Sequence, residues 1–576
     1  MSSSADPTGA ALRILDDAWS EVSRSPYVQM RLGRLPSRLP EISLAEAGRR
    51  AAVGTDLTQR IAALGDLADP RLPHDLQIAL RLARYYAGHW RREADWYWLV
   101  HDPLGLGFFG LFSATAYSGG FLVGFLRGIG ASAPLEQPGD LDRYLALMAD
   151  HARLLGQMRE RALGQAERGI LMPRAQVQQA RALVPGLKAA VRPSWQVAAA
   201  RVRAGDAAAF VAEVERRIAS RIEPACDALL AVYDDDYLAR APDAVGMSQY
   251  PGGAEVYAEL VKLHTTQDLT PQQVHDAGLK RMAEVEAQMQ AIRDEVGFRG
   301  SAAEYHAQLD ADPRWRAGSI EGVTAVFQRY IDRFRPHYER CFDWQTASQP
   351  QAEALPAALE GSMTFGYYDG PKKPGDPGRY LFNGANLTRA GLANIGALSY
   401  HELVPGHHQH LCTQNENRTQ HPLLQHAFVN AYNEGWAEYA STLAGELGCY
   451  PEPEERYGRL LMDAFLTCRL VVDTGMNAFG WTLDQARGYL RAKSQMGDNE
   501  IRTETIRYSC DIPGQSLAYK LGDTFMFALR SRMQAARGER FSLREFHRAV
   551  LHPGALPLPD LAFHLDHVIA TEPAAA

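Results

Sequence analysis

The sequence predicts a mainly α-helical protein, and three observations support this fold class. Long stretches place apolar residues at i, i+3, i+4 and i+7, with charged residues on the remaining faces. The composition, 46% hydrophobic and 22% charged, is typical of globular proteins and excludes disordered and fibrous classes. Only 361–397 breaks the helical pattern. A chain of 576 residues allows about four domains or one large helical body. We expect one continuous body with a boundary between 1–245 and 246–576.

The expected helices follow one another along the chain. Apolar periodicity predicts helices over 94–100, 141–167, 207–233, 269–296 and 426–447. The fourth has a clear start, with Thr270 as N-cap, Pro271 at the first helical position and Gln273 three residues after the cap. The uncharged stretch 103–126 is long enough to resemble a membrane span, but it is rich in glycine and lacks basic flanks. We expect a buried hairpin or loop there.

The region 361–397 predicts a small β-sheet just before the next helix. Eight Gly or Pro residues between 366 and 386 are interleaved with aromatic residues. The segments 364–368 and 379–383 are expected to form short strands joined by a turn-rich loop, and helical pattern resumes at Leu398. A surface loop is the alternative interpretation.

Charge and cysteine content limit the partners and the compartment. Lys and Arg total 60 against 68 Asp and Glu, so the net charge of −8 excludes a dedicated nucleic-acid-binding protein. Six scattered cysteines without a C-x-x-C pair favour reduced thiols, and the first 20 residues lack a secretory signal pattern. We therefore expect a cytoplasmic protein with no membrane contact. A homodimer is left open.

The most informative segment begins with His401-Glu402, the start of the H-E-x-x-H motif of zinc peptidases. The second histidine is missing, because position 405 is Pro. In a regular helix His407 and His408 would lie about 9 Å and about 10.5 Å along the axis from His401, too far to share one zinc ion. Pro405 and Gly406 break or bulge the helix, however, and this break could bring His407 beside His401.

A second segment, N-E-G-W-A-E-Y at 433–439, supplies carboxylates. Glu434 and Glu438 are four residues apart and share one helix face. Two histidines and Glu434 would hold one zinc ion and leave a position for water, with Glu402 as general base. Glu438 would orient a histidine ring or, like His408, serve as an alternative ligand. Manganese and cobalt suit the same ligands.

These motifs resemble the bacterial domain-of-unknown-function 885 family, a relative of the zincin-like metallopeptidases. Its H-E-x-x-P-G-H-H pattern stands at 401–408 and E-G-W-A-E-Y at 434–439, and similar blocks occur at 250–279, 367–383 and 507–522. The resemblance implies a large helical body with a deep cleft and a catalytic region within 246–576. N-E-G-W-A is similar to the N-E-G-F-A segment of gluzincin aminopeptidases, whose Glu is the third zinc ligand. In zincin oligopeptidases another His follows the second ligand by three residues, as His410 follows His407, which favours His407 over His408.

The chemistry requires an electrophile beside the metal and groups that hold the substrate. We expect Tyr519 to stabilise the oxyanion, with Tyr508 as second choice, and Gln515 to share a helix face with Tyr519. The remaining candidate substrate contacts are two cations that would grip a carboxylate and three residues that would line the cleft: Arg507, Lys520, Tyr367, Tyr368 and Asn383. Core packing is the alternative for the tyrosines.

The sequence thus predicts a zinc-dependent hydrolase that cleaves peptide or amide bonds of short peptides. A non-catalytic zinc-binding or regulatory protein of the same fold is the alternative. A structural zinc site would fill the fourth position with a protein ligand, such as His408 or Glu438, whereas a catalytic site keeps it open.

Overall fold

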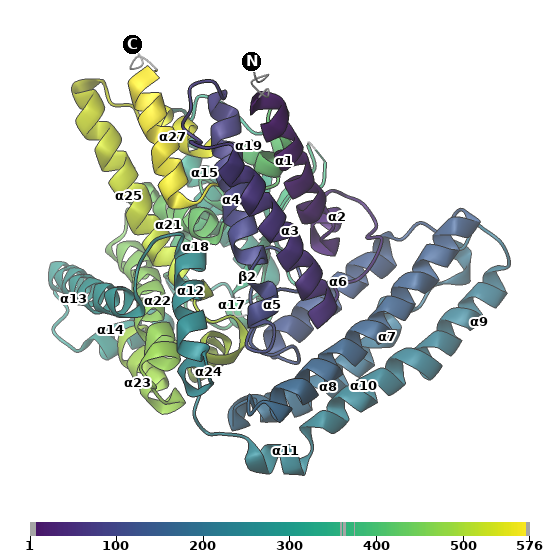
Figure 1. Ribbon diagram of the computed structural model, residues 1–576. Coiled ribbons are helices and arrows are strands. Elements are labelled where there is room, and N and C mark those ends of the chain that lie inside the picture. Colours follow the sequence, from purple (N-terminus) through teal and green to yellow (C-terminus); the bar gives the residue numbers. More distant parts are fainter. Residues whose placement is uncertain (1–6, 357–359, 361–364, 374, 572–576) are drawn as a thin grey trace, which may run out of the picture.

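The computed structural model describes residues 7–356, 360, 365–373 and 375–571, and it is mainly helical with one small sheet (Figure 1). The chain begins with helices that pack side by side at the N-terminal edge: α1 (Pro7–Ser23), α2 (Pro26–Arg31), α3 (Leu44–Ala63), α4 (His74–Trp90) and α5 (Glu93–Trp96). The fold class predicted from helical periodicity is confirmed at this level.

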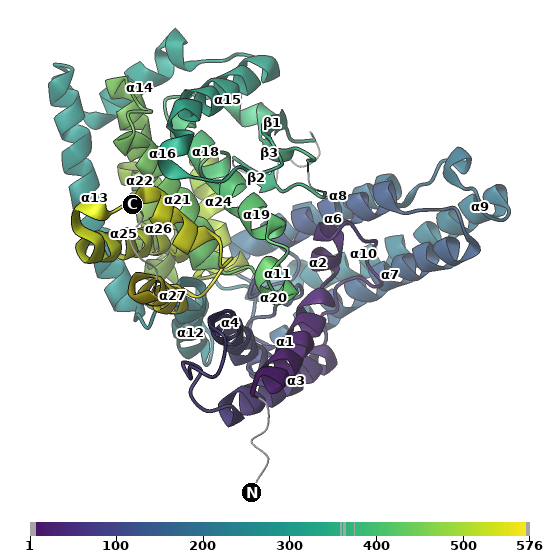
Figure 2. The same cartoon turned by 90° about the horizontal axis from the view of Figure 1, so that it is seen from above.

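The next helices form an elongated arm that projects from the rest of the molecule in both views (Figures 1 and 2). Its members, with the short α11 at its base, are α6 (Ala116–Ser132), α7 (Pro138–Glu167), α8 (Arg174–Trp195), α9 (Ala207–Arg217), α10 (Glu223–Leu230) and α11 (Asp235–Arg240). A π-helical turn at 218–222 joins α9 to α10, so the helix expected over 207–233 is present with local changes of pitch.

Five helices lead from the arm to the sheet: α12 (Gly253–Thr265), α13 (Pro271–Glu295), α14 (Ala302–Ala311), α15 (Ile320–Phe334) and α16 (Tyr338–Cys341). The start of α13 is as expected, because the Thr270 side chain accepts from the Gln273 amide and the Gln273 side chain caps in return. The helix expected over 94–100 is shorter, since α5 ends at Trp96.

The sheet has three strands in the order β1-β3-β2, namely β1 (Pro350–Ala354), β2 (Gly366–Asp369) and β3 (Gly378–Phe382). β2 and β3 are the two expected strands and pair antiparallel, with Tyr368 opposite Tyr380. Thr364, the first residue of the expected segment, lies outside the described residues. The sequence analysis missed β1, which pairs parallel to β3.

The remaining helices complete the body: α17 (Gly384–Leu387), α18 (Ile395–Glu402), α19 (His407–Glu416), α20 (Pro422–Gln425), α21 (Asn430–Glu446), α22 (Pro453–Ala478), α23 (Leu483–Lys493), α24 (Asp498–Ile506), α25 (Ala518–Arg537), α26 (Leu543–Leu551) and α27 (Leu558–Thr571). The helix expected over 426–447 begins four residues later, at Asn430.

Two hydrophobic clusters join parts of the chain that are distant in sequence. One contains Leu15 and Tyr86 together with Phe327 and Trp436. The other centres on the arm but includes Leu470 and Leu521 of the C-terminal half. Both clusters therefore contain residues from each side of the boundary expected at residue 245. The division of the chain at that boundary stays a prediction.

The uncharged stretch 103–126 forms a loop followed by the start of α6. Phe109, Leu111 and Ala114 are fully buried, and Leu111 donates its backbone N–H to the carbonyl of Asp511 (3.1 Å). The described part of this stretch thus lines the interior. Within the described ranges of the chain, no helix has both the length and the hydrophobicity needed to span a bilayer.

Candidate metal centre

The helix that carries His401 stops where the sequence predicts a break. α18 ends at Glu402 and α19 begins at His407. Gly406 is required here, since a Cβ atom at this position would lie 1.9 Å from the carbonyl oxygen of His401. The indole of Trp436, on α21, donates to the carbonyl of Pro405 (3.0 Å). The chain therefore changes direction between α18 and α19, and Trp436 of the N-E-G-W-A-E-Y segment holds this turn in place.

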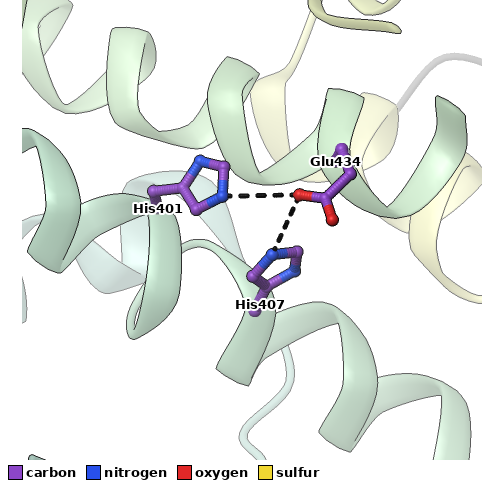
Figure 3. A group of neighbouring side chains, drawn as sticks. All are labelled: His401, His407 and Glu434. Carbon is purple, nitrogen blue, oxygen red and sulfur yellow. Dashed lines mark ion pairs between the residues drawn. The ribbon is translucent and has the colours of Figure 1, made fainter. Parts of the chain in front are cut away.

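This turn brings the side chains of His401 and His407 together. Their ring centroids are 4.9 Å apart and the rings are nearly perpendicular. Glu434 approaches from α21, with Oε2 3.5 Å from His401 Nε2 and 3.3 Å from His407 Nε2 (Figure 3). The three ligand atoms all lie within 4.8 Å of one another. The three side chains come from three helices and point to one place.

The spacing of these atoms fits a divalent cation. Tetrahedral ligands at the zinc bond length of about 2.0–2.1 Å lie roughly 3.3–3.4 Å from one another. Glu434 Oε2 is buried and accepts no hydrogen bond from the described residues. A buried carboxylate oxygen without a donor is costly unless a cation meets it. The residues present therefore fit a zinc-like ion.

The electrostatics of the group agree with this geometry. Burial opposes a charge on His401, but the carboxylates of Glu434 and Glu438 outweigh it and raise the pKa of His401 to about 10. Burial also opposes a charge on Glu434, and the two imidazoles outweigh it, so the pKa of Glu434 lies well below its usual range. The site favours positive charge at the imidazoles, which a bound divalent cation would supply.

Glu438 lies on the other side of His401. Its Oε2 is 3.4 Å from His401 Nδ1, and its Oε1 accepts from Arg459 (2.6 Å). Arg459 also donates to Thr442 (2.6 Å). Glu438 is thus placed to orient the His401 ring rather than to join the three-residue group, and Arg459 fixes Glu438 in turn.

A close contact between two helices places Tyr519 at the group. A Cβ atom on Gly435 would lie 2.5 Å from the backbone of Gly522, so α21 and α25 touch next to Glu434. Tyr519, at the start of α25, lies nearly parallel to the His401 ring with centroids 6.1 Å apart. Burial, aided by Glu434, raises the pKa of Tyr519 to about 12. The phenol therefore keeps its proton at neutral pH and can donate a hydrogen bond.

Glu402, the candidate base, is 9% exposed. Its pKa is raised by burial, which outweighs the opposing effect of His407 and His401. Burial raises the pKa of Tyr368 and of Tyr380 too, and the Glu402 carboxylate adds to both shifts. A carboxylate with a raised pKa beside the group suits proton transfer.

Four candidate residues are engaged elsewhere. His408 donates through Nε2 to the Ser348 carbonyl (3.1 Å), which leaves Nδ1 to accept from Tyr368 (2.9 Å), so neither nitrogen faces the group. Lys520 pairs with Asp463 (3.0 Å) and Asp523 (2.6 Å) in the interior.

Asn383 is 1% exposed and holds the turn after β3, donating to the Glu360 carbonyl (2.7 Å) and accepting from the Asn386 amide (3.1 Å). Tyr508 is fully buried and donates to Glu504. We therefore leave Lys520 and Asn383 out of the substrate contacts proposed below, and we propose neither His408 as a metal ligand nor Tyr508 as the oxyanion donor.

The other candidates remain near the group or at the sheet edge. Arg507 donates to Gln515 (2.8 Å), and its charge acts on Tyr519. Gln515 is buried and donates to Asn430 (3.3 Å). Tyr367 is 37% exposed on the edge strand β2.

Sequence reasoning missed Arg459, Arg469 and Glu504, although all three lie close to residues of the site. Arg459 and Arg469 are charged residues within the long helix α22, where a solvent-facing stripe is the ordinary expectation. Helical spacing alone gives no sign of their burial. Trp436 lay inside the second motif, but its contact with Pro405 depends on the tertiary fold.

The comparisons with known proteins assign the family. The sequence model of the family described as "Bacterial protein of unknown function (DUF885)" matches residues 26–565, so the chain belongs to this family. No curated protein matches. A putative lipoprotein from Colwellia psychrerythraea has a similar structure, with a TM-score of 0.85, 23% identity, and coverage of 98% of this chain and 100% of the other. A putative lipoprotein of unknown function from Shewanella oneidensis is also similar, with a TM-score of 0.72 and 16% identity. That match covers 97% of this chain and 99% of the other.

These two structures share the fold over nearly the whole chain. Their descriptions overturn the cytoplasmic location expected from the sequence, because both are putative lipoproteins, a class attached to membranes by a lipid anchor. The expectation rested on cysteine usage and on the first 20 residues, neither of which reports how relatives are attached.

Proposed function

We propose that this protein is a zinc-dependent hydrolase of the gluzincin type that cleaves peptide or amide bonds of short peptides. One observation carries the proposal: His401, His407 and Glu434 converge with ligand spacing beside a buried acid, Glu402, and a protonated phenol, Tyr519. The body around them would be zincin-like, with the substrate cleft along the sheet edge.

His401, His407 and Glu434 would hold the ion, which supplies Lewis-acid activation of the scissile carbonyl and of water. Glu402 accepts the proton of the attacking water and returns it to the leaving amine. Tyr519 donates a hydrogen bond to the carbonyl oxygen as its charge develops. Glu438 keeps the His401 ring in its orientation.

The substrate contacts follow from the remaining candidates. Arg507 is anchored by Gln515 and its side chain is 21% exposed, so it can pair with a substrate carboxylate. β2 is an edge strand of the described sheet, and its outer edge can pair with an extended peptide, with Tyr367 and Tyr368 alongside. Short peptides with a free carboxyl end are the substrate class that fits both features.

The non-catalytic alternative requires a fourth protein ligand. His408 and Glu438, the two candidates, have partners other than the shared position. The group found among the described residues has three members only. This supports a position left for water or substrate. For the cellular location, we propose attachment to the cell envelope, as the descriptions of the two solved structures suggest for those proteins.

Metal analysis combined with a mass-spectrometric screen of peptides of varied length and blocked termini tests the proposal. We expect about one zinc ion per chain and cleavage of short peptides. Glu402→Gln should keep the metal and lose about 10²–10⁴-fold in kcat. Glu339→Gln, an exposed change far from the motifs in sequence, is the matched control. Metal retained with unchanged hydrolysis in Glu402→Gln would exclude Glu402 as the base.

A further inference from the structure

A buried arginine lies against the ring of Tyr519. Arg469, on α22, is 4% exposed, and its Cζ atom is 4.5 Å from the centroid of the Tyr519 ring. The same guanidinium lies 4.3 Å from the ring centroid of Phe465, one turn earlier on α22. A buried guanidinium over two aromatic rings makes a cation–π contact that favours one position of each ring.

The guanidinium is itself held in place by groups from other segments. Its Nε donates to the hydroxyl of Tyr508 (2.8 Å), and its Nη2 donates to Glu504 (3.2 Å). The Tyr508 hydroxyl donates to the same carboxylate. Glu504 is 3% exposed and belongs to α24. Tyr508 and Glu504 thus hold the guanidinium of Arg469 in one position. Tyr508 serves to hold Arg469 and does not contact the reacting atoms.

Tyr519 also has a neighbour at the metal group, because its ring is nearly parallel to that of His401 at 6.1 Å. Rotation of the phenol about χ1 or χ2 would disturb the contacts with both His401 and Arg469. The hydroxyl must reach an oxygen whose position is set by the ion, and a misplacement of about 1 Å in such a contact costs about 10²-fold in rate.

We propose that Arg469, anchored by Glu504 and Tyr508, is a positioning residue that holds the Tyr519 ring so that its hydroxyl faces the substrate carbonyl oxygen. This inference rests on the proposed function, in which Tyr519 donates to that oxygen. A purely structural role would give the same contacts, so the test must separate the two.

The test uses a charge-neutral pair of changes, Arg469→Met with Glu504→Gln, because removing Arg469 alone would take the nearer of two cations from the buried Glu504 carboxylate. The other cation is Arg507 (3.9 Å), so kinetics are measured on amidated peptides, which do not need Arg507 for a carboxyl end. We expect kcat to fall about 10–100-fold with little change in KM, since the lost contact acts in the transition state. In a Tyr519→Phe background the same pair should cause no further loss, because the residue through which Arg469 acts is gone. Metal content and thermal unfolding verify that each variant is folded.

A matched control is Arg491→Met with Asp498→Asn, which removes an exposed ion pair (2.7 Å) between α23 and α24. It should leave kcat unchanged. An equal loss of kcat from the buried-pair changes with and without the Tyr519→Phe substitution would overturn the proposal. So would an unchanged kcat when the buried pair is replaced and Tyr519 is retained.

A second measurement does not need activity. With 3-fluorotyrosine placed at position 519, the fluorine resonance reports the ring environment in metal-free and zinc-loaded protein. We expect one narrow line in the otherwise unchanged chain and a shifted or broadened line in the buried-pair variant. An identical line in both would overturn the positioning role. If the unchanged chain cleaves none of the peptides, the proposed function fails, while the fluorine spectra still decide whether Arg469 holds the ring.

Discussion

The arm and the metal centre both bury polar groups, but they satisfy them differently. In the arm, Arg161 of α7 is 1% exposed and donates to the carbonyls of Tyr97, Leu99 and Leu111 at 2.9–3.3 Å. His151 accepts from the indole of Trp195 (3.0 Å). In the metal centre, Glu434 Oε2 accepts no hydrogen bond from the described residues.

We infer that Arg161 and His151 complete the fold of the arm, whereas the Glu434 carboxylate awaits a ligand. Folded proteins satisfy nearly all buried polar atoms, so a group of unsatisfied atoms at one place needs an explanation. In the arm, neutral acceptors balance each of these donors. At the metal centre, Glu434 Oε2 lies 3.3–3.5 Å from a nitrogen of His401 and of His407, and a cation bound to all three atoms would satisfy them together. The comparison makes four expectations that can be tested.

The largest effect should follow from Glu434→Gln, which replaces the carboxylate ligand by a neutral amide. Zinc at about 100 times its dissociation constant should stabilise the unchanged protein by about 2.7 kcal/mol, and the variant should lose most of this gain. Thermal unfolding with and without zinc measures it. Glu446→Gln, at the far end of the same helix, should behave like the unchanged chain. An equal gain with zinc in Glu434→Gln would contradict the metal centre.

The next effect concerns substrate recognition by Arg507. A charge-assisted hydrogen bond is worth about 1.5–3 kcal/mol, or roughly 10–150-fold in kcat/KM. Arg507→Met should therefore reduce cleavage of peptides with a free carboxyl end by that factor and leave amidated peptides unaffected. Arg502→Met, an exposed change on α24, is the control. Equal cleavage of free and amidated peptides by the unchanged protein would contradict the proposal that Arg507 binds the substrate carboxyl end.

Two glycines at helix contacts sharpen the comparison. A Cβ at Gly435 would lie 2.5 Å from Gly522, and one at Gly130 of the arm 2.0 Å from the carbonyl oxygen of Ser194. Gly435→Ala and Gly130→Ala should each cost about 1–3 kcal/mol of stability by overpacking. Only Gly435→Ala should also weaken zinc binding in a chelator competition, because Glu434 is its neighbour. Similar zinc affinity in both would show that the helix contact does not set the metal centre.

The last effect, which is absent at neutral pH, is a pH dependence within the arm. Burial lowers the pKa of His151 to about 3, whereas the unfolded chain has a value of about 6.5. Below about pH 6.5 the unfolded state binds a proton that the folded state does not, so stability falls as the pH drops, by about 2 kcal/mol at about pH 5. His151→Gln should remove this part of the acid sensitivity. Hydrogen exchange of α7 and α8 at about pH 7 and about pH 5 measures it, and equal acid sensitivity of both chains would contradict it.

The sequence was most informative where local rules decide the outcome. The capping box at Thr270 and the break at Pro405 depend on neighbouring residues, and both are present as expected. Glu434 could be assigned to the group because it lies in a contiguous motif. The convergence of its carboxylate with His401 agrees with that reading.

Residues whose roles depend on packing could not be predicted from sequence. β1 has no alternating pattern of its own, and its pairing partner β3 follows along the chain only after β2. Lys520 looked like a free cation, but its helix turns it toward two interior carboxylates. Nothing in the local sequence shows that Arg459 and Arg469 are buried. The 26-residue helix α22 carries charged residues along its length, and the sequence does not tell which of them face neighbouring helices.

The hydrogen bond from Trp436 to Pro405 joins the two ligand-bearing segments through protein atoms alone. We therefore expect the segments to stay together without an ion, so that an ion can be taken up and released without refolding of the chain. Occupancy would then track the supply of metal outside the molecule, and a preparation stripped by a chelator should be restored by adding the ion back.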